Sequence, residues 1–399
     1  MALSDHQYAI IENIERHIDQ LLMPSEKQPF EIIVNIEKHV KKIKPWIPSQ
    51  AIICIGKYSI QAILNGAFIH NVRDVLPLFI DKSTKEIMNW SKSPIKPHNI
   101  LGLDTKNDTL LWFHVYRELI KNDSFIKRLK NKPLDNIRQA IIVASLENGV
   151  GSSLFPLICS QLQMININPI ALSILPSKVQ PADAHFNAFS SIGLSKLTGF
   201  KPIILMDRDK LENYVGVNRK GTTIKGNMII DYLLELLSEK RTMGQEISEL
   251  SRSFNIKFFT PILTTGASFR IYGSIENMLK TGLIKPLLKF DLASASVLYV
   301  FFRIPSHLKT KLVREKIDLS LANWFQDKVN LKSIYFTDPI YTKDTSDRVD
   351  MVILVGGFNT TKLFTSMKKK IDSIKKEALN LGFIDEKEWQ EIDESLMKD

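Results

Sequence analysis

Two short stretches of this sequence contain residue types that suit chemistry on a phosphate. In the stretch Met243 to Leu250, Glu246 and Glu249 stand three positions apart. Paired carboxylates near a phosphate and its metal can orient or deprotonate a water molecule, which hydrolysis requires. The stretch therefore predicts a hydrolytic acid pair, although glutamates at this spacing are also common on the surfaces of ordinary helices.

The second stretch is a glycine-bearing turn, ENGVGSSLFP, at residues 147–156. It follows the apolar run Gln139 to Leu146 and opens an amphipathic stretch, so it indicates a turn from a strand into a helix. Glycines at such a turn let backbone N–H groups close on a phosphate, and the helix N-terminus adds a favourable partial charge. The residues expected to contact the phosphate are Asn148, Gly149, Val150, Gly151 and Ser152. A tight turn that binds no ligand is the alternative.

Two well-known phosphate turns fit this stretch poorly. A Walker loop needs Lys after its second glycine, where this chain has Ser152. A dinucleotide fingerprint needs a third glycine, where the chain has Leu154, and an acidic residue at the end of the next strand, which Leu172 to Leu175 lacks. An NAD-dependent oxidoreductase is therefore kept only as a third alternative.

The turn resembles the phosphate loop of the tubulin/FtsZ superfamily, which is normally Gly-Gly-Gly-Thr-Gly-Ser/Thr-Gly followed by a run such as Ala-Ala-Pro. The residues that match are Gly149, Gly151, Ser152 and Pro156. The residues that depart are Glu147, Asn148, Val150 and Ser153. One helix and one strand later, ILMDRDKL at residues 204–211 is similar to the family's Ile-Pro-Asn-Asp-Arg-Leu run. The resemblance implies that Asp209 lies in a guanine-nucleotide pocket.

The resemblance also assigns roles further along the chain. Asn227 takes the place of an asparagine that hydrogen-bonds the guanine edge in the family. The family's next loop, Asn-x-Asp-x-x-Asp, enters the nucleotide pocket of the following subunit, and Glu246 and Glu249 keep its acidic spacing. The resemblance therefore implies GTP or GDP with Mg²⁺ as cofactors, hydrolysis completed by the acidic loop of a neighbouring subunit, and head-to-tail filaments used in cell division or cell shape.

The first strand is followed by GKYSIQ at residues 56–61, where the family has a glycine-rich turn. Gly56 and Gln61 fit that pattern, and Lys57 adds a positive charge. Tyr58 carries a side chain where backbone should approach phosphate, and Glu147 would repel a phosphate unless a cation intervened. These departures leave a second alternative, a catalytically degenerate FtsZ-like scaffold with weak or no nucleotide turnover.

The elements that must position these residues follow from short apolar runs that alternate with helical patterns. The runs are Ala51 to Ile55, Pro77 to Ile80, Gln139 to Leu146, Pro169 to Leu175 and Pro202 to Met206. Such runs, bounded by Gly, Pro or polar residues, predict buried parallel strands. We therefore expect a doubly wound, Rossmann-like α/β domain with its ligand crevice at the carboxyl ends of the strands.

The segment Ile224 to Lys240 is apolar around most of a helix circumference, which predicts a central helix buried between two layers. Later strand and helix patterns predict a smaller α+β domain that resembles the FtsZ activation domain. The expected organisation is an N-terminal helical extension at 1–45, the nucleotide-binding domain at 46–222, the central helix and acidic loop at 223–255, the α+β activation domain at 256–360, and C-terminal helices at 361–399.

Composition limits the remaining possibilities. No apolar run approaches the roughly 18 residues that a membrane helix needs, and the start of the chain lacks a secretion signal, so we expect a cytoplasmic protein. The net charge is +10, but the lysines are scattered without interleaved aromatic residues, so no nucleic-acid partner is expected. The expected partners are further copies of the chain, together with division or membrane-tether proteins. An amphipathic helix near Ile11 to Leu22 is expected to dock onto protein.

Overall fold

A computed structural model describes residues 48–66, 68–71, 74–91, 95–105, 108–121, 124–130, 137–326 and 329–397. The expected N-terminal helical extension, including the amphipathic helix near Ile11 to Leu22, lies outside these residues. Residues 49–399 form one compact unit, and the description that follows concerns this unit alone.

The unit is built on one sheet of eleven strands in the order β11-β10-β13-β9-β6-β5-β4-β1-β2-β3, with β12 beside β10. The strands of the first half are β1 (Gln50–Ile55), β2 (Val75–Asp81), β3 (Ile100–Gly102), β4 (Gln139–Ser145), β5 (Ile170–Leu175) and β6 (Ile203–Asp207). All of them pair in parallel. Every residue of β1, β4 and β5 is buried, as expected for a parallel sheet covered on both faces. The predicted α/β fold class is confirmed.

The same sheet continues into the second half of the chain. Its strands are β9 (Phe258–Ser268), β10 (Val297–Pro305), β11 (Ser333–Phe336), β12 (Ile340–Thr342) and β13 (Arg348–Gly356). β6 pairs in parallel with β9, whereas β13 is antiparallel to both β9 and β10. Hydrogen bonding therefore crosses the boundary predicted at residue 256, and the domain limits within 49–399 stay a prediction.

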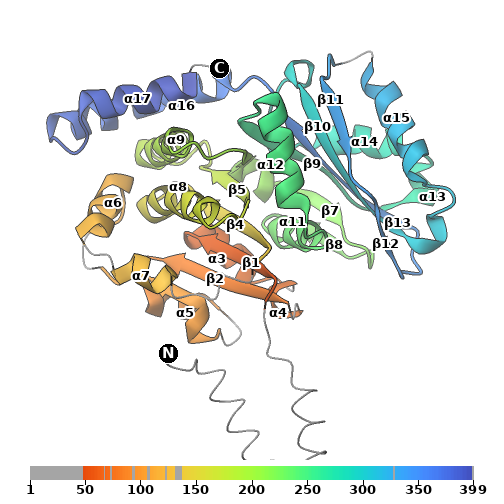
Figure 1. The fold of residues 1–399 in the computed structure, drawn as a ribbon, viewed down its shortest axis with the longest axis horizontal. Coiled ribbons are helices and arrows are strands. Elements are labelled where there is room, and N and C mark those ends of the chain that lie inside the picture. The colour runs from red at the N-terminus through yellow and green to blue at the C-terminus, as the bar shows by residue number, and fades with distance from the viewer. Residues whose placement is uncertain are drawn as a thin grey trace, which may run out of the picture. The chain divides into compact units, whose positions relative to one another are not determined.

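Helices cover both faces of the sheet (Figure 1). One face of the first half packs against α6 (Trp112–Lys121), α7 (Ser124–Lys130), α8 (Gly149–Met164), α9 (Ala182–Leu197), α16 (Thr361–Asn380) and α17 (Glu386–Met397). The other face packs against α3 (Lys57–Leu64), α4 (Phe68–Asn71), α5 (Thr84–Trp90), α11 (Met228–Ser238) and α12 (Met243–Phe254). In the second half, α14 (Ile275–Ile284) and α15 (Arg314–Gln326) pack against β10 and β13.

The remaining elements are short: α10 (Arg208–Glu212), α13 (Phe269–Tyr272), the 3-10 turns η1 (Pro97–Asn99), η2 (Leu292–Ser294) and η3 (Ser306–Leu308), and the hairpin β7 (Val215–Val217) and β8 (Thr223–Lys225). None of the helices in the described part of the chain has the length and apolar character needed to cross a membrane.

Two predictions along the central segment are corrected by the structure. The helix expected from Ile224 begins only at Met228, because residues 223–225 form β8 and Gly226 (φ 56°) turns the chain. The acidic loop expected at residues 244–249 is wrong, since these residues lie in the first turns of α12. Met243, Ile247 and Leu250 recur at helical spacing and are buried, which is why this segment is helical.

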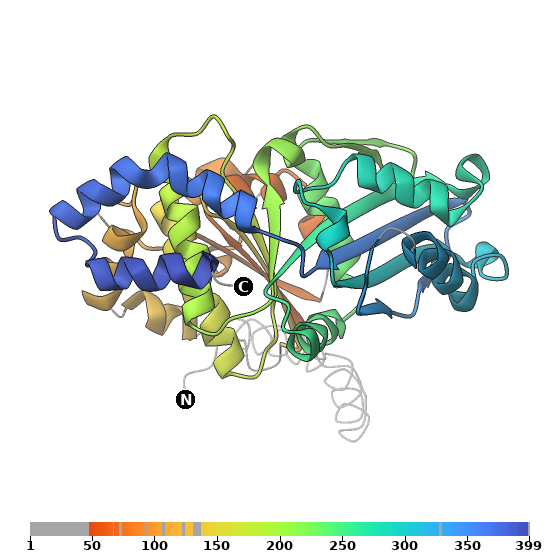
Figure 2. The same ribbon diagram turned by 90° about the horizontal axis from the view of Figure 1, so that it is seen from above.

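The two C-terminal helices occur where the sequence predicts them. Both pack against α9, so the end of the chain returns to the first half of the sheet (Figure 2). The Trp389 ring of α17 stacks on Phe186 and Phe189 of α9, with centroids 5.5 and 5.7 Å away. This pair of helices is therefore part of the core of the unit.

Candidate functional site

The predicted phosphate turn lies at the carboxyl edge of the sheet, between β4 and α8. Asn148 caps α8, and its side-chain oxygen accepts a hydrogen bond from the Gly151 N–H at 2.9 Å. Ser152 donates both its N–H and its hydroxyl to the Asn148 carbonyl, at 3.0 and 2.7 Å. Gly149 and Val150 are buried in the same turn. The sequence therefore located the turn correctly, and the chain itself satisfies these groups.

Residues 109–112 lie directly across this turn. The Gly149 N–H donates to the Thr109 carbonyl at 3.1 Å, and a Cβ at Gly149 would come within 2.5 Å of the carbonyl oxygens of Thr109 and Leu111. Asn187 of α9 is fully buried and fixes the segment by accepting from the Trp112 N–H at 2.9 Å. The glycine thus makes room for the chain's own backbone, and its N–H is bonded within the chain.

Glu147 forms the centre of an ionic cluster beside the turn. Its carboxylate pairs with Arg208 and accepts a hydrogen bond from the Gln180 amide at 2.6 Å. Arg208 also bonds Glu212 at 2.7 Å, and its guanidinium lies 4.2 Å from the centroid of the Tyr58 ring. Arg208 supplies a positive charge beside Glu147. No local pattern in the sequence identified Arg208 as this partner.

The first predicted loop contributes backbone geometry to this edge. Gly56 has φ 86° and precedes α3, and a Cβ there would lie 2.5 Å from the Ser145 hydroxyl, so only glycine fits. Lys57 is exposed at the start of α3, with its ammonium 5.8 Å from the Trp90 ring. Gln61 lies one turn further along α3 and is half-buried. These three predicted residues share one helix start.

Several polar atoms at this edge are buried and have no hydrogen-bond partner among the described residues. They are Asp81 Oδ2, Ser145 Oγ and the Tyr58 hydroxyl. Asp81 ends β2 opposite Gly56 and is only 5% exposed, and this burial raises the pKa of its carboxyl to about 6. A buried carboxyl whose pKa is raised in this way is a candidate functional group.

Asp209 links the loop after β5 to the end of β6 by hydrogen bonds. Its two carboxylate oxygens accept from the Ser177 hydroxyl and, at 3.0 Å, from the Lys178 N–H. Burial alone would raise the pKa of Asp209, but these hydrogen bonds leave it below its ordinary value. Asp209 therefore lies at the predicted edge and makes a structural contact there. Asn227 is half-buried at the N-cap position of α11, where its side chain makes no capping hydrogen bond.

Glu246 and Glu249, the predicted catalytic pair, differ in environment. The Glu246 carboxylate accepts from the Tyr299 hydroxyl and the Thr242 hydroxyl, both at 2.8 Å, and pairs with Lys240 at 2.9 Å. Burial alone would raise its pKa, but these donors bring it below the ordinary value. Glu249 is exposed and accepts a hydrogen bond from Gln245 at 2.8 Å.

A cavity of about 750 Å³ lies alongside α11, away from the carboxyl edge. Gln50 and Val75, the first residues of β1 and β2, line it, so it opens toward the amino ends of these strands. Two ion pairs form among its charged side chains, Arg219 with Glu235 at 3.1 Å and Arg241 with Asp74. The sequence predicted no site at this edge.

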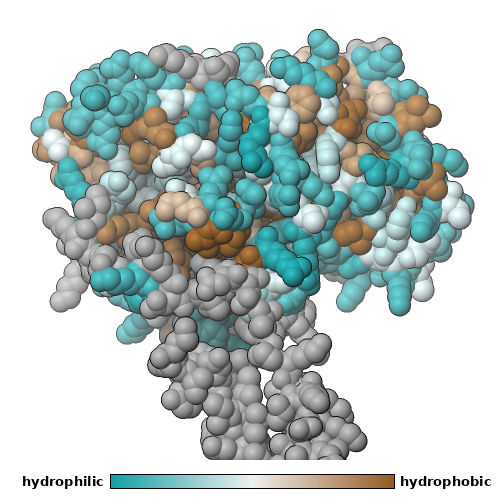
Figure 3. Space-filling view, in the orientation of Figure 1, coloured by the Kyte–Doolittle hydropathy of each residue, from teal (hydrophilic) through white to brown (hydrophobic). Residues whose placement is uncertain are grey.

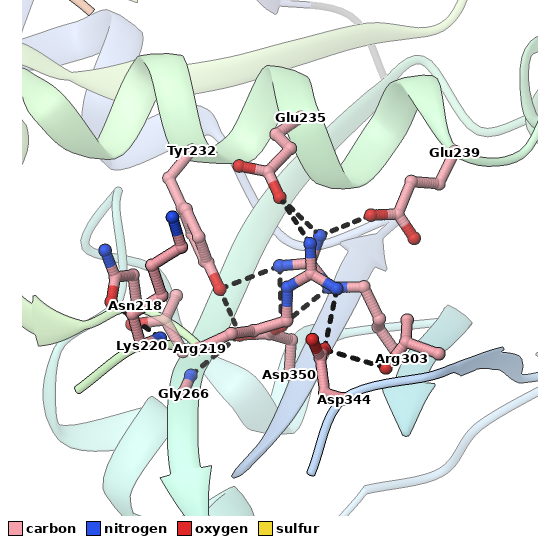
Figure 4. Close-up of polar contacts among 12 residues, drawn as sticks. Asn218, Arg219, Lys220, Tyr232, Glu235, Glu239, Gly266, Arg303, Asp344 and Asp350 are labelled. Atoms are coloured by element: carbon pink, nitrogen blue, oxygen red, sulfur yellow. Dashed lines mark hydrogen bonds and ion pairs between the residues drawn. The ribbon is translucent and has the colours of Figure 1, made fainter. Parts of the chain in front are cut away.

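Beneath the cavity, Arg303 of β10 is completely buried (Figure 4). Its guanidinium bonds Asp350 of β13 at 2.8 Å and Glu235 of α11 at 2.7 Å, and it also pairs with Glu239. The Tyr232 hydroxyl accepts from Arg303 at 2.7 Å and donates to Asp350 at 2.9 Å. The network ties α11 to the second half of the sheet. Sequence reasoning missed it because a single Arg or Asp inside an apolar strand gives no periodic signal.

The other candidate features are weak. Among the described residues, no group of three or more His, Cys, Asp or Glu side chains could hold a metal ion. Hydrophobic and hydrophilic residues are interspersed over the described part of the face in Figure 3. The carboxyl edge of β1, β2, β4 and β6 is therefore where the predicted residues of the first loop and the glycine turn, together with Asp209, gather, whereas Glu246 and Glu249 lie on α12.

The chain has the tubulin/FtsZ fold, as the resemblance predicts. One similar solved structure is CetZ from Methanosaeta thermophila strain DSM 6194, with a TM-score of 0.64 and 14% identity, covering 84% of this chain and 93% of that one. A second is the GTPγS-bound protofilament of CetZ2 from Haloferax volcanii, with a TM-score of 0.61 and 14% identity, covering 83% and 99%. A third is an FtsZ dimer described as empty, from M. jannaschii, with a TM-score of 0.56 and 11% identity, covering 83% and 93%. No family model and no curated protein matches the sequence.

Proposed function

We propose that this chain is a cytoplasmic scaffold of the tubulin/FtsZ fold that self-associates head to tail for cell division or cell shape, without turning over nucleotide. The observation that carries the proposal is at the turn between β4 and α8. There the Gly149 N–H donates to the Thr109 carbonyl, and Arg208 pairs with the Glu147 carboxylate. Groups that would hold a phosphate are thereby engaged within the chain.

The position of Glu246 supports the loss of turnover. A carboxylate that completes the site of a neighbouring subunit has to reach outside its own chain, whereas that of Glu246 already accepts from Lys240, Thr242 and Tyr299. Glu249 is the only member of the predicted pair that is exposed. Glu246, one of the two predicted catalytic carboxylates, is thus engaged in contacts within its own chain.

Two observations support self-association. The solved structures that this chain resembles include a protofilament and a dimer. Within this chain, α12 packs at the amino end of β5, where Ser248 lies 3.3 Å from the Asn168 side chain, while the glycine turn lies at the carboxyl end of β4. The two predicted contact elements therefore lie at opposite edges of the sheet, as a head-to-tail contact requires.

The competing function is GTP-dependent assembly with hydrolysis, the activity first implied by the resemblance. It is favoured by the GTPγS bound in the CetZ2 protofilament and the GDP bound in a CetZ1 monomer, both of the same fold. Any turnover of this kind must rely on Glu249 reaching a neighbouring subunit, since Glu246 is engaged within its own chain.

Light scattering of the purified full chain over a range of protein concentrations, with GTP, with GDP and without nucleotide, separates the two functions. In all three conditions we expect the same scattering, which exceeds that of a monomer by more as the protein concentration rises. We expect no phosphate release. Phosphate release from GTP that rises steeply with protein concentration, and is lost in Glu249→Ala but kept in the control Glu391→Ala on α17, would establish the competing function. Scattering that never exceeds that of a monomer would refute self-association.

A further inference from the structure

The contacts of Glu147 and of its partner Arg208 join four separate parts of the carboxyl edge. Glu147 belongs to the turn after β4, Gln180 to the loop after β5, Arg208 to the start of α10 after β6, and Tyr58 to α3 after β1. Gln180 and Arg208 donate to the same carboxylate oxygen, Glu147 Oε2. The ion pair of Glu147 and Arg208 therefore links segments that follow four neighbouring strands of the sheet.

The environment of this group is that of a held anion. The side chains of Glu147 and Arg208 are only 17% and 25% exposed, so solvent screens their attraction less than at the open surface. The Arg208 guanidinium lies 4.2 Å from the centroid of the Tyr58 ring, and it presents the planar donors that bind carboxylate and phosphate alike. Gln180 adds a neutral donor to the same oxygen, so two side chains converge on one oxyanion oxygen.

We propose that the Glu147 carboxylate is a built-in anion that stands in for a phosphate between Arg208 and Gln180, and that its removal opens a site for phosphate. The shared chemistry is that of inorganic phosphate and of the phosphate groups of a nucleotide. The inference rests on the proposed loss of nucleotide turnover at this edge, but its test measures thermal stability and does not depend on assembly.

The decisive variant is Glu147→Ala, which removes the carboxylate and leaves space beside Arg208. In buffer without phosphate, we expect a lower melting temperature than in the wild type, because Arg208 keeps only Glu212 as an ionic partner. Inorganic phosphate should then raise the melting temperature of this variant by about 2–4 °C once it exceeds its dissociation constant at least tenfold. Sodium chloride at matched ionic strength should not reproduce the rise.

Two matched controls locate the effect. Glu212→Gln removes the other, half-exposed partner of Arg208 but leaves Glu147 in place, so it should respond to phosphate no more than the wild type does. In the double variant Glu147→Ala with Arg208→Gln, the response should be lost. If Glu147→Ala does not fold, Glu147→Gln, which keeps the size of the side chain, is measured in the same way and should show a smaller rise.

An equal phosphate response in Glu147→Ala, Glu212→Gln and the wild type, or a response that persists without Arg208, would overturn the built-in anion. Comparing inorganic phosphate with GTP in Glu147→Ala shows whether the opened site takes free phosphate only or also a nucleotide. Phosphate release from GTP by the wild type would instead contradict the proposed function, and it leaves the phosphate comparison between variants intact.

Discussion

Asp81 is the residue whose protonation should most affect stability at this edge. Burial raises its pKa from 3.8 to about 6, so the folded state disfavours the ionised carboxylate. This cost is fully present above pH 6 and disappears as the pH falls through 6 toward 3.8. About two pKa units correspond to roughly 3 kcal/mol.

We therefore expect Asp81→Asn to gain unfolding free energy relative to the wild type as the pH rises from 5 to 8, by roughly 1–3 kcal/mol. Urea unfolding at several pH values measures this difference. Asp209→Asn is the control, since the pKa of Asp209 is lowered from 3.8 and its difference from the wild type should not vary over this pH range. If the difference in unfolding free energy between the wild type and Asp81→Asn does not vary with pH, the titration of Asp81 is ruled out.

Glu246 is expected to act through stability. In Glu246→Ala the Tyr299 hydroxyl, which is fully buried, loses its acceptor, and Lys240 loses its partner. An unsatisfied buried donor costs about 1–3 kcal/mol, so the unfolding free energy should fall by that amount. The exposed Glu249→Ala should change it by less than about 0.5 kcal/mol. Equal effects of the two variants in urea unfolding would show that Glu246 is not anchored as described.

At the residue scale, the sequence predicted the positions of the site residues better than it predicted their contact partners. The turn at residues 147–156 could be located because an apolar strand, two glycines and a helix start lie next to each other in the chain. The hydrogen bond from Gly149 to Thr109 and the pairing of Glu147 with Arg208 join residues that are far apart in the sequence. No local pattern carries that information, so the turn alone was expected to hold a phosphate.

At the scale of elements, the long strands and helices were predictable and the short ones were not. β1, β4 and β5 are continuous apolar runs, whereas β3, β7 and β8 have three residues each, too few to show a period. The acidic loop was misassigned because the resemblance to a family loop outweighed the helical spacing of Met243, Ile247 and Leu250. The physical pattern in the sequence was the better guide there.

The attachment of α11 to the sheet gives a testable consequence of the buried network. Arg303→Met should lower the unfolding free energy by about 3–5 kcal/mol, because it leaves the buried Asp350 carboxylate without its cation. Replacing both partners, as Arg303→Met with Asp350→Leu, should cost less than the single change, since no charge remains buried alone.

A double-mutant cycle in urea, with Asp350→Leu as the fourth corner, measures this coupling. Arg314→Met is the control, because Arg314 pairs with Asp338 at the surface, where both side chains are at least half exposed, and surface pairs contribute about 0–1 kcal/mol. Additive effects of Arg303→Met and Asp350→Leu would mean that the two side chains do not act as a pair.

The whole unit should behave as one cooperative body, although the sequence indicated two domains. The hydrophobic cluster beneath α11 contains residues from β1 and β4 and also from β10 and β13. Helices α16 and α17, which follow the second half, pack against α9 in the first. Composition and periodicity showed the change from parallel to mixed strands, but the joining of β6 to β9 and the return of the C-terminus depend on contacts distant in sequence.

Native-state hydrogen exchange at increasing urea concentration tests this cooperativity. Amides of β4 in the first half and of β13 in the second should merge into one opening reaction with the same free energy, since neither half can open without exposing the shared core. Leu354→Ala in β13 removes a side chain that is 1% exposed in that core, and should cost about 2–5 kcal/mol. If the unit is cooperative, protection in β4 falls by the same amount as in β13. A loss confined to β13 would show instead that the two halves unfold separately.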